Sequence, residues 1–236
     1  SIMADVEALK KQAGIEACKF VQTGMKVGLG TGSTVKHTVI ELGRRIAEEG
    51  LEIVGVPTSI STEILAKEVG IPLVELSEID GLDIVIDGAD EYNPEFQLIK
   101  GGGAALLREK IVAQESSAMV VVADDRKRVD TLGAFPLPIE VTPFSHAATV
   151  RALTRLLDCR VNIRMAGDGP VMTDNGNMIA DAHTGPKISS PVKTEAEILL
   201  IAGVVQVGLF NNMCDAVVLA GTNGVETIVK PNGRLE

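Results

Sequence analysis

Short runs of aliphatic residues recur along the first half of the sequence, and stretches with helical periodicity lie between several of them. Residues 26–30 (KVGLG), 83–86 (DIVI) and 119–123 (MVVVA) are too short for helices, and their apolar residues are largely consecutive. Strands of this kind are buried on both faces, which is typical of a parallel sheet covered by helices on each side. We therefore expect the first 130 or so residues to form a doubly wound α/β domain.

Hydrophobic periodicity and turn residues define the expected elements. The expected strands are 25–30, 52–56, 72–76, 82–87 and 118–123, and the expected helices are 4–22, 33–49, 61–68 and 104–116.

The pattern changes near residue 132, where prolines interrupt the segment PLPIEVTP. A helix is expected at 145–157, a hairpin with its turn at Asn175-Gly176 between the strands VMTD and NMIADAH, and another helix at 194–202. The strand-like segments VVQVGLF, DAVVLAG and GVETIVK follow, and some of them can rejoin the first sheet. We predict a catalytic domain of residues 1–131 plus about 207–236, and a smaller α+β domain of about 132–206.

Composition excludes several classes of function. The chain has 22 basic and 32 acidic residues, a net charge of −10 and only 3% aromatic residues, which argues against a nucleic-acid-binding surface. Apolar runs fall short of the roughly 18 residues that a membrane span requires, and we recognise no secretory signal. The three cysteines are far apart in sequence and form no CxxC pair. We expect a cytoplasmic protein with no membrane partner.

The segment Gly28–Thr34 (GLGTGST) lies between an expected strand and an expected helix. Glycines allow the backbone to turn tightly, and amides at a helix N-terminus attract anions such as phosphate. Ser33 stands where a dinucleotide fingerprint needs its third glycine, and the segment also fails the P-loop pattern. It therefore favours a phosphate site rather than an NAD or ATP site, and the alternative is a simple turn with Ser33 as a helix cap.

Three acids in DGADE follow the apolar strand that ends near residue 87. Ligands of open parallel sheets bind beyond the carboxyl ends of the strands, so Asp87 and Asp90 are candidates for general acid–base catalysis. A plain turn or a Mg²⁺ site is the alternative, but DGADE contains no DxD motif and the three histidines lack ligand-like spacing. We expect no metal and no cofactor.

The third expected site segment is Lys100 with three successive glycines, followed by the expected helix that contains Glu109. The glycine amides and the Lys100 charge are suited to an oxyanion. One turn away from Glu109 on the helix, both before and after it, the residues are apolar. We therefore expect Glu109 to be partly buried, with a raised pKa that suits a general base, unless it pairs with a basic residue elsewhere.

Together and in this order, GLGTGST, DGADE and KGGGAALLREK closely resemble the type A family of ribose-5-phosphate isomerases. The segments VVVADDRKRVDTLG, PLPIEVTP, VMTDNGN and GVVQVGLF extend the resemblance from EALKKQAG to the last strand. It implies a Rossmann-like domain with a smaller α+β domain, a homodimer or homotetramer, and metal-independent interconversion of ribose 5-phosphate and ribulose 5-phosphate in the non-oxidative pentose phosphate pathway.

The resemblance also assigns roles to individual residues. Glu109 is the expected proton acceptor, helped by Asp87, Asp90 and Lys100 as further catalytic residues. The expected substrate-binding residues are Thr31, Gly32, Ser33, Thr34, Asp87, Gly88, Ala89, Asp90, Lys100, Gly101, Gly102, Gly103 and Lys127, with Lys10 as a further candidate. Isomerisation through a cis-enediolate then needs Glu109 to move a proton between C2 and C1, after a ring opening that we assign to Asp87 with Lys100.

Two other functions fit parts of the pattern. An amino-sugar phosphate deaminase would share the glycine loops and acids, but we would expect a histidine near the ring and none lies in the three motifs. A sugar-phosphate-sensing module of a transcription regulator would need an attached helix-turn-helix and a basic face, and neither is recognisable in the sequence.

Overall fold

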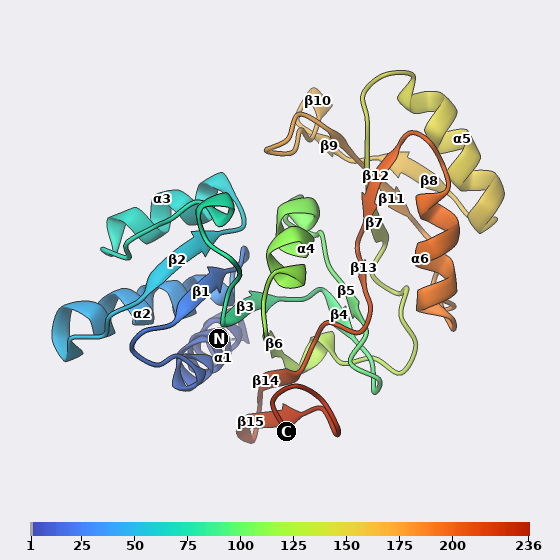
Figure 1. Ribbon diagram of the computed structural model, residues 1–236. Helices are drawn as coiled ribbons and strands as arrows, with labels where there is room; N and C mark the ends of the chain where they lie inside the picture. Colours follow the sequence, from blue (N-terminus) through green and yellow to red (C-terminus); the bar gives the residue numbers. More distant parts are fainter. Residues whose placement is uncertain (1) are drawn as a thin grey trace. The chain divides into compact units, whose positions relative to one another are not determined.

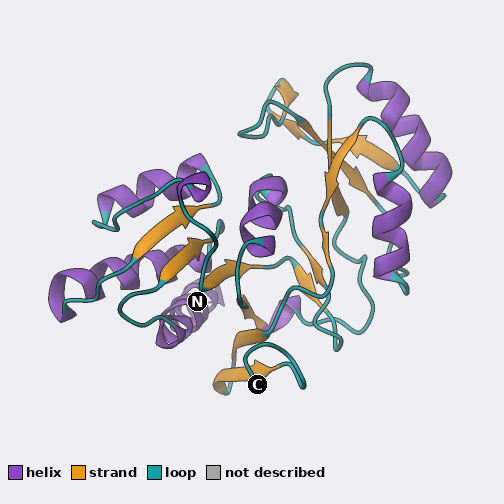
Figure 2. Cartoon of the chain, viewed as in Figure 1, coloured by secondary structure: helices purple, strands orange, loops and turns teal. Residues whose placement is uncertain are grey.

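The computed structural model describes residues 2–236, and by its contacts the chain divides into two compact units (Figures 1 and 2). The first unit comprises residues up to 88, 108–127 and 213–236, and the second comprises 89–107 and 128–212. The chain passes from one unit to the other inside DGADE and inside LLREK. Two of the three predicted site segments therefore contribute residues to both units.

The first unit is built on a six-stranded sheet in the order β15-β14-β6-β3-β1-β2. Its strands are β1 (Lys26–Leu29), β2 (Val54–Pro57), β3 (Ile84–Gly88), β6 (Met119–Asp124), β14 (Ala216–Gly221) and β15 (Gly224–Val229). All neighbouring strands pair in parallel except β15, which forms an antiparallel hairpin with β14 at one edge. The two C-terminal strands thus rejoin the sheet begun by the N-terminal half.

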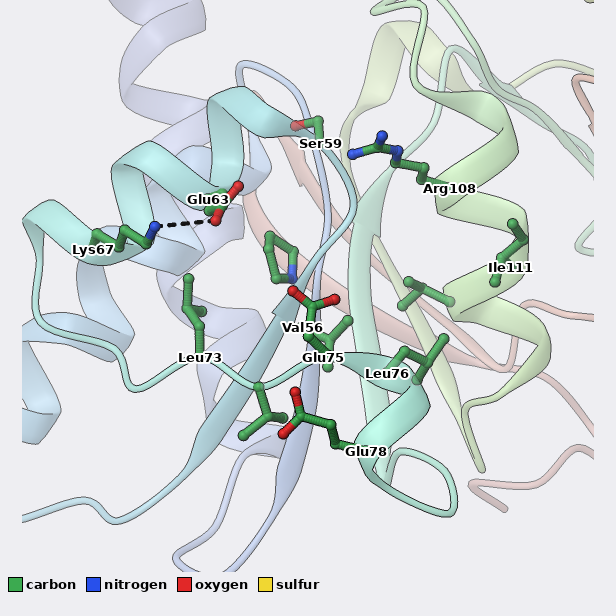
Figure 3. A pocket seen from close by; sticks show the side chains of 13 residues that line it. Val56, Ser59, Glu63, Lys67, Leu73, Glu75, Leu76, Glu78, Arg108 and Ile111 are labelled. Carbon is green, nitrogen blue, oxygen red and sulfur yellow. Dashed lines mark hydrogen bonds and ion pairs between the residues drawn. The ribbon is translucent and has the colours of Figure 1, made fainter. Parts of the chain in front are cut away.

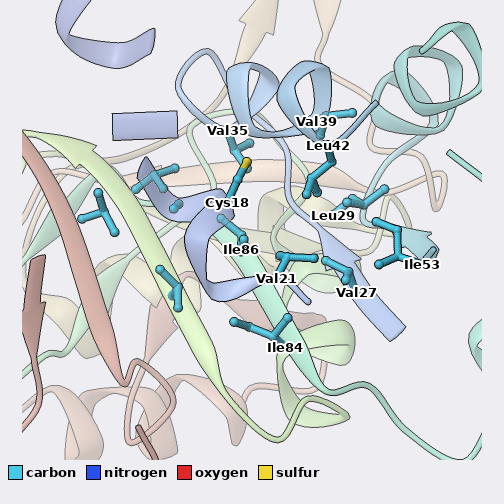
Figure 4. Close-up of a cluster of buried hydrophobic side chains, with 14 of the residues drawn as sticks. Cys18, Val21, Val27, Leu29, Val35, Val39, Leu42, Ile53, Ile84 and Ile86 are labelled. Carbon is cyan, nitrogen blue, oxygen red and sulfur yellow. The ribbon is translucent and has the colours of Figure 1, made fainter. Parts of the chain in front are cut away.

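Helices cover both faces of this sheet. They are α1 (Ile2–Ala17), α2 (Val35–Glu49), α3 (Ile60–Glu68) and α4 (Leu106–Gln114), with 3-10 turns at Cys18–Phe20, Leu76–Glu78 and Asp125–Lys127. Apolar residues of α1 and α2 pack on one face against strand residues such as Val27, Leu29 and Ile86 (Figure 4). On the other face, a Cβ at Gly28 would come within 2.7 Å of the Val112 side chain, so this glycine lets α4 approach β1. The predicted doubly wound α/β architecture is confirmed.

The second unit contains mainly antiparallel pairs. Its four-stranded sheet has the order β12-β7-β11-β8, a three-stranded sheet has the order β13-β5-β4, and β9 pairs with β10. The strands are β4 (Glu91–Tyr92), β5 (Leu98–Ile99), β7 (Leu137–Val141), β8 (Val161–Ile163), β9 (Met165–Ala166), β10 (Gly169–Pro170), β11 (Met178–Ala182), β12 (Val204–Val207) and β13 (Leu209–Phe210). The helices are α5 (His146–Leu157) and α6 (Pro191–Leu199). This is the predicted smaller α+β part.

Alternation along β7 gives the four-stranded sheet two different faces. Leu137, Ile139 and Val141 enter the hydrophobic core, to which α5 and α6 contribute Leu153 and Ile198. The intervening residues Pro138 and Glu140 point to the opposite face because side chains alternate along a strand. Asp181 of β11 is paired with Pro138 and lies on that second face, where it binds Arg164, which in turn contacts the glycine-rich segment described below.

Two expected strands are wrong. Residues 72–76 form only one bridge, between Leu73 and Gly55, before the 3-10 turn at Leu76–Glu78 ends the extended stretch. The segment VMTD contributes only the bridge between Met172 and Met178. The Asn175-Gly176 turn itself is present, with Gly176 at φ 77° and Thr173 N donating to Asn177 O at 2.8 Å.

The boundaries of the two contact-based units differ from those of the predicted domains. Residues 89–107 group with the second unit because β4 and β5 pair with β13, and residues 207–212 stay there for the same reason. The predicted domains, 1–131 plus about 207–236 and about 132–206, stay a prediction about independently folding parts. Within residues 2–236, no helix is both long and apolar enough to cross a membrane.

The strand order of the first unit places its ligand-binding edge. After β1 the chain forms β2 on one side of it, and then β3 on the other side. The order of winding therefore reverses between β1 and β3, and the carboxyl ends of strands at such a switch point form the usual ligand crevice of open α/β sheets. The glycine loop follows β1 and Asp87 lies near the end of β3, so both lie at this position.

Candidate active site

The glycine loop and Asp87 are hydrogen-bonded to each other at the switch point. The Gly30 amide donates to Ile86 O at 2.9 Å, and the Thr31 amide donates to Asp87 Oδ1 at 3.1 Å. The same oxygen accepts the Gly88 amide at 2.8 Å. Asp87 is fully buried, and a Cβ at Gly30 would overlap its carboxylate. Gly30 is therefore required for Asp87 to lie where it does.

A cluster of hydroxyl groups holds Thr31 from the side of β2. Thr31 Oγ1 lies 2.8 Å from Thr58 Oγ1, 2.7 Å from Ser59 Oγ and 3.2 Å from Thr62 Oγ1. Thr62 Oγ1 in turn donates to Gly30 O at 2.9 Å. Because a hydroxyl offers one donor and two acceptor positions, these neighbours occupy the Thr31 hydroxyl, and its backbone amide is bound to Asp87. Thr31 thus has a structural role in the loop, which sequence reasoning did not separate from substrate binding.

The hydroxyl residues that follow β2, namely Thr58, Ser59 and Thr62, were missed as contributors to this loop. Ser59 caps α3 by accepting the Thr62 amide at 3.1 Å, and serine is one of the residues favoured at the start of a helix. That local signal gives no indication that the same side chains reach a loop about 30 residues earlier in the chain.

Lys10 and the remaining hydroxyls of GTGST lie where α2 begins. Lys10 Nζ donates to Ser33 Oγ at 3.0 Å, and Thr34 is the N-cap residue of α2. Gly32 has φ 137°, in the region that favours glycine, and both Gly32 and Ser33 are exposed. A lysine, a hydroxyl and the start of a 15-residue helix together make a favourable position for an anion.

The carboxyl end of β6 carries Lys127 on the 3-10 turn Asp125–Lys127. Next to it, the Asp124 carboxylate binds the Arg126 guanidinium at 2.7 and 3.0 Å. Burial acts to raise the pKa of Asp124, but the hydrogen bonds from Arg126 and the Arg126 and Lys127 charges outweigh it and keep that pKa below its usual value. Arg126 therefore forms an ion pair with Asp124. The next residue, Lys127, is half-buried.

Glu109 lies in the first turn of α4 and is only 4% exposed. The apolar residues three and four positions before and after it, Ala105, Leu106, Val112 and Ala113, are all buried as well. This agrees with the setting that we expected from the sequence for a carboxylate that accepts a proton from carbon.

The second unit holds Asp90 and the glycine-rich segment. Asp90 Oδ2 accepts the Gly102 amide at 2.8 Å, and a Cβ at Gly102 would come within 2.5 Å of Asp90 Oδ1. Gly101 has φ 116°, and a side chain there would contact Pro138 and Leu106 at 2.7 and 2.8 Å. These glycines are thus required by close packing and backbone conformation, while Gly102 and Gly103 are exposed.

Lys100 is a buried cation, 2% exposed, in the same segment. Its Nζ lies 5.5 Å from the centre of the Phe210 ring, a distance at which the ring face attracts a positive charge. Its amide donates to Gly208 O at 2.8 Å. Lys100 is therefore fixed at both its backbone and its side chain.

A pocket of about 540 Å³ lies beside the glycine loop in the first unit (Figure 3). In Figure 3, Arg108 of α4 lies opposite Ser59, and the Glu63–Lys67 ion pair of α3 forms another wall. None of the predicted site residues lines this pocket within the described part of the chain. One of its lining residues, Ser59, contacts Thr31 of the glycine loop, and another, Arg108, precedes Glu109 in the chain.

The predicted absence of a metal is not decided by this geometry. Residues 2–236 contain no group of three or more His, Cys, Asp or Glu side chains arranged to hold a metal ion. Asp87, the most buried acid of DGADE, uses one carboxylate oxygen for two backbone amides. Metal independence therefore stays a prediction that chelation tests.

Comparison with known proteins identifies the family. The model of the family described as ribose 5-phosphate isomerase A (phosphoriboisomerase A) matches residues 54–224. A curated relative from Bacillus mycoides, ribose-5-phosphate isomerase A, is 50% identical over 218 residues, which are 92% of this chain and 98% of the relative. The chain belongs to the ribose 5-phosphate isomerase A family. The predicted resemblance and the predicted enzyme class, an isomerase, are confirmed.

Solved structures of the family share the fold. Ribose 5-phosphate isomerase A from Methanocaldococcus jannaschii is 43% identical with a TM-score of 0.90, covering 95% of this chain and 99% of that one. A D-ribose-5-phosphate isomerase in complex with phospho-erythronic acid is 41% identical with a TM-score of 0.91, over the same shares. The fold predicted from the apolar runs is therefore that of the family over almost the whole chain.

Proposed function

We propose that this chain interconverts D-ribose 5-phosphate and D-ribulose 5-phosphate. The observation that carries the proposal is family membership over 92% of the chain, with the acids of the three motifs present: Asp87, Asp90 and Glu109. A relative that binds phospho-erythronic acid supports it further, because such a ligand combines a phosphate with a planar carboxylate. An enediolate also has two neighbouring oxygens in one plane.

We assign the substrate phosphate to the start of α2. Ser33 and Thr34 supply hydroxyl groups, the helix N-terminus supplies amides and a favourable dipole, and Lys10 supplies charge 3.0 Å from Ser33 Oγ. Lys127 is the second candidate cation. These local groups bind a dianion even though the chain as a whole carries a net charge of −10.

We assign the proton transfer between carbons to Glu109. The carboxylate removes the proton from C2 and returns it to C1, so that one base serves both steps through a cis-enediolate. Its position supports this role, because the carboxylate is buried in the first turn of α4, as we expected for a general base.

The sugar oxygens need a separate set of groups. We propose that Asp87 and Lys100 transfer the protons of ring opening, and that Lys100, Asp90 and the amides of the Gly101–Gly103 segment stabilise the charge that develops on oxygen. Asp87 is held rigidly by two amides, and Asp90 is held by the Gly102 amide. Such fixed groups lose little energy to reorganisation when charge develops.

The activity is tested by incubating the purified protein with ribose 5-phosphate after exhaustive dialysis against a chelator, and measuring ketose formation. We expect ribulose 5-phosphate to form at the same rate with and without the chelator. Loss of activity that Mg²⁺ or Zn²⁺ restores would contradict the metal-independent mechanism. An inactive but folded protein, with or without added metal, would contradict the proposed function itself.

The biological setting is proposed from the family resemblance. We propose a cytoplasmic enzyme of the non-oxidative pentose phosphate pathway that assembles as a homodimer or homotetramer. Light scattering on a purified sample tests the assembly, and a monomeric mass at micromolar concentration would contradict it.

A further inference from the structure

The carbonyl groups of the Gly101–Gly103 segment are bound by an arginine that the sequence patterns did not single out. Arg164 Nη1 donates to Gly101 O and to Gly102 O, both at 3.0 Å. Gly101 O also accepts the Ala104 amide at 3.0 Å, so both of its acceptor positions are used. One guanidinium group thus contacts two successive peptide groups of the segment.

Arg164 is itself held in a fixed orientation. Its Nε and Nη2 donate to the two carboxylate oxygens of Asp181 at 2.9 and 2.7 Å, in the paired geometry that guanidinium and carboxylate groups favour. The backbone is anchored too, since Arg164 N donates to Ile179 O at 2.8 Å. Both side chains are mostly buried, with exposed fractions of 19% and 13%. The arginine is therefore a rigid part of the second unit.

The segment that Arg164 contacts has an unusual backbone. Gly101 has φ 116° and Ala104 has φ 59°, a conformation that residues with a side chain rarely adopt. Glycine adopts a positive φ without strain, whereas the left-handed conformation of Ala104 is unfavourable and persists only where the surroundings hold it. The two hydrogen bonds from Arg164 supply such a constraint.

These contacts also affect the amide groups of the same peptide bonds. The Gly101 carbonyl and the Gly102 N–H belong to one peptide group, and the Gly102 carbonyl and the Gly103 N–H belong to the next. A hydrogen bond to the carbonyl oxygen polarises the peptide group and strengthens its N–H as a donor. The Gly102 N–H binds Asp90, so Arg164 acts on Asp90 through one peptide group and on the exposed Gly103 amide through another.

We propose that Arg164, oriented by Asp181, is a positioning residue for the isomerisation. It fixes the Gly101–Gly103 segment and thereby Asp90, and it strengthens the amides that stabilise charge on the sugar oxygens. The inference rests on the proposed function, because it assigns Arg164 to the oxygen-stabilising part of that mechanism. In this role Arg164 does not itself contact the substrate.

The test compares Arg164→Met, which removes the donors at similar length, with Arg160→Met as the matched control. Arg160 is exposed four residues earlier, and its side chain bonds only to Asn162, at 3.5 Å, among the described residues. For Arg164→Met we expect kcat to fall by about 10- to 100-fold with KM changed less than about threefold, because the affected interaction forms chiefly in the transition state. Inhibition by inorganic phosphate should be unchanged, since the residues that we assign to phosphate binding belong to the first unit.

Arg164→Lys and Asp181→Asn keep the test informative if Arg164→Met does not fold. Lysine retains a charge but cannot make the paired contact with Asp181. We expect kcat about 3- to 10-fold below wild type for each variant, again with KM little changed. A folded Arg164 variant whose kcat equals that of Arg160→Met, or whose KM rises while kcat is unchanged, would overturn the inference. Failure of the proposed function is distinguished from this outcome because the wild-type protein would then be inactive.

Discussion

The Gly30→Ala substitution tests the junction between the glycine loop and Asp87. A Cβ at residue 30 would overlap Oδ1, Cγ and Cα of Asp87, so the carboxylate must move. Asp87 is fully buried and accepts the Thr31 and Gly88 amides at 3.1 and 2.8 Å. The substitution therefore both crowds a packed position and disturbs hydrogen bonds to a charged group.

The expected magnitude follows from these two effects. Crowding a well-packed site costs about 1–3 kcal/mol, and losing a hydrogen bond to a charged group costs about 1.5–3 kcal/mol. We expect the free energy of unfolding to fall by about 2.5–6 kcal/mol, which lowers Tm by roughly 5–24 °C for a chain of this size. Because a displacement near 1 Å at a catalytic group reduces rates by about 10²-fold, kcat/KM should fall by about that factor.

Thermal melting followed by circular dichroism measures the first effect, and ketose formation from ribose 5-phosphate measures the second. Gly88→Ala is the matched control for stability, because its new Cβ would lie 3.8 Å from the nearest atom, Val122 O, which is an ordinary contact. Its free energy of unfolding should stay within about 0.5 kcal/mol of wild type. A Gly30→Ala protein with the Tm of Gly88→Ala and wild-type kcat/KM would refute the reasoning.

Two further predictions concern the first unit. Lys10→Ala should raise KM for ribose 5-phosphate about 10-fold or more with kcat changed less than about threefold, because Lys10 is assigned to the phosphate rather than to the reacting carbons. The control is Lys11→Ala, a substitution at an exposed residue. A loss confined to kcat in Lys10→Ala would count against this assignment. Cys18 should resist iodoacetamide in the native protein at pH 8, since burial raises the pKa of its thiol to about 12, and partly exposed Cys159 should react first. Mass spectrometry locates the label, and rapid native modification of Cys18 would contradict its burial.

The sheet of the first unit was predictable because consecutive apolar residues have a clear physical meaning. The runs near residues 84 and 120 became central parallel strands, as a chain buried on both faces requires. Residues 72–76 look similar in sequence, but only Leu73 bridges to Gly55 before the chain turns. Sequence pattern indicates that a segment suits a strand, whereas neighbouring backbone decides whether it finds a partner.

The candidate site was predictable where it consists of short sequence motifs with an unusual composition. Runs of glycine, and acids directly after a strand, are unusual enough to indicate chemistry, and the family resemblance assigned their roles. The supporting residues carry no such mark. Ser59 has the appearance of a helix cap, and Arg164 that of an ordinary polar residue 62 positions from Gly102. Their contributions depend on tertiary contacts that a sequence pattern does not contain.

The most direct test of the central claim uses NMR to measure proton exchange at the substrate carbons, with ribose 5-phosphate as the substrate in D₂O. We predict that the wild-type protein forms ribulose 5-phosphate with solvent deuterium at C1, because Glu109 exchanges its proton with water between removal and return. Glu109→Gln should slow both product formation and deuterium incorporation by about 10² or more, as for loss of a general base. Exposed Glu115→Gln, just beyond the same helix, should match wild type. A folded Glu109→Gln protein with wild-type rates would contradict the assignment of Glu109 as the base.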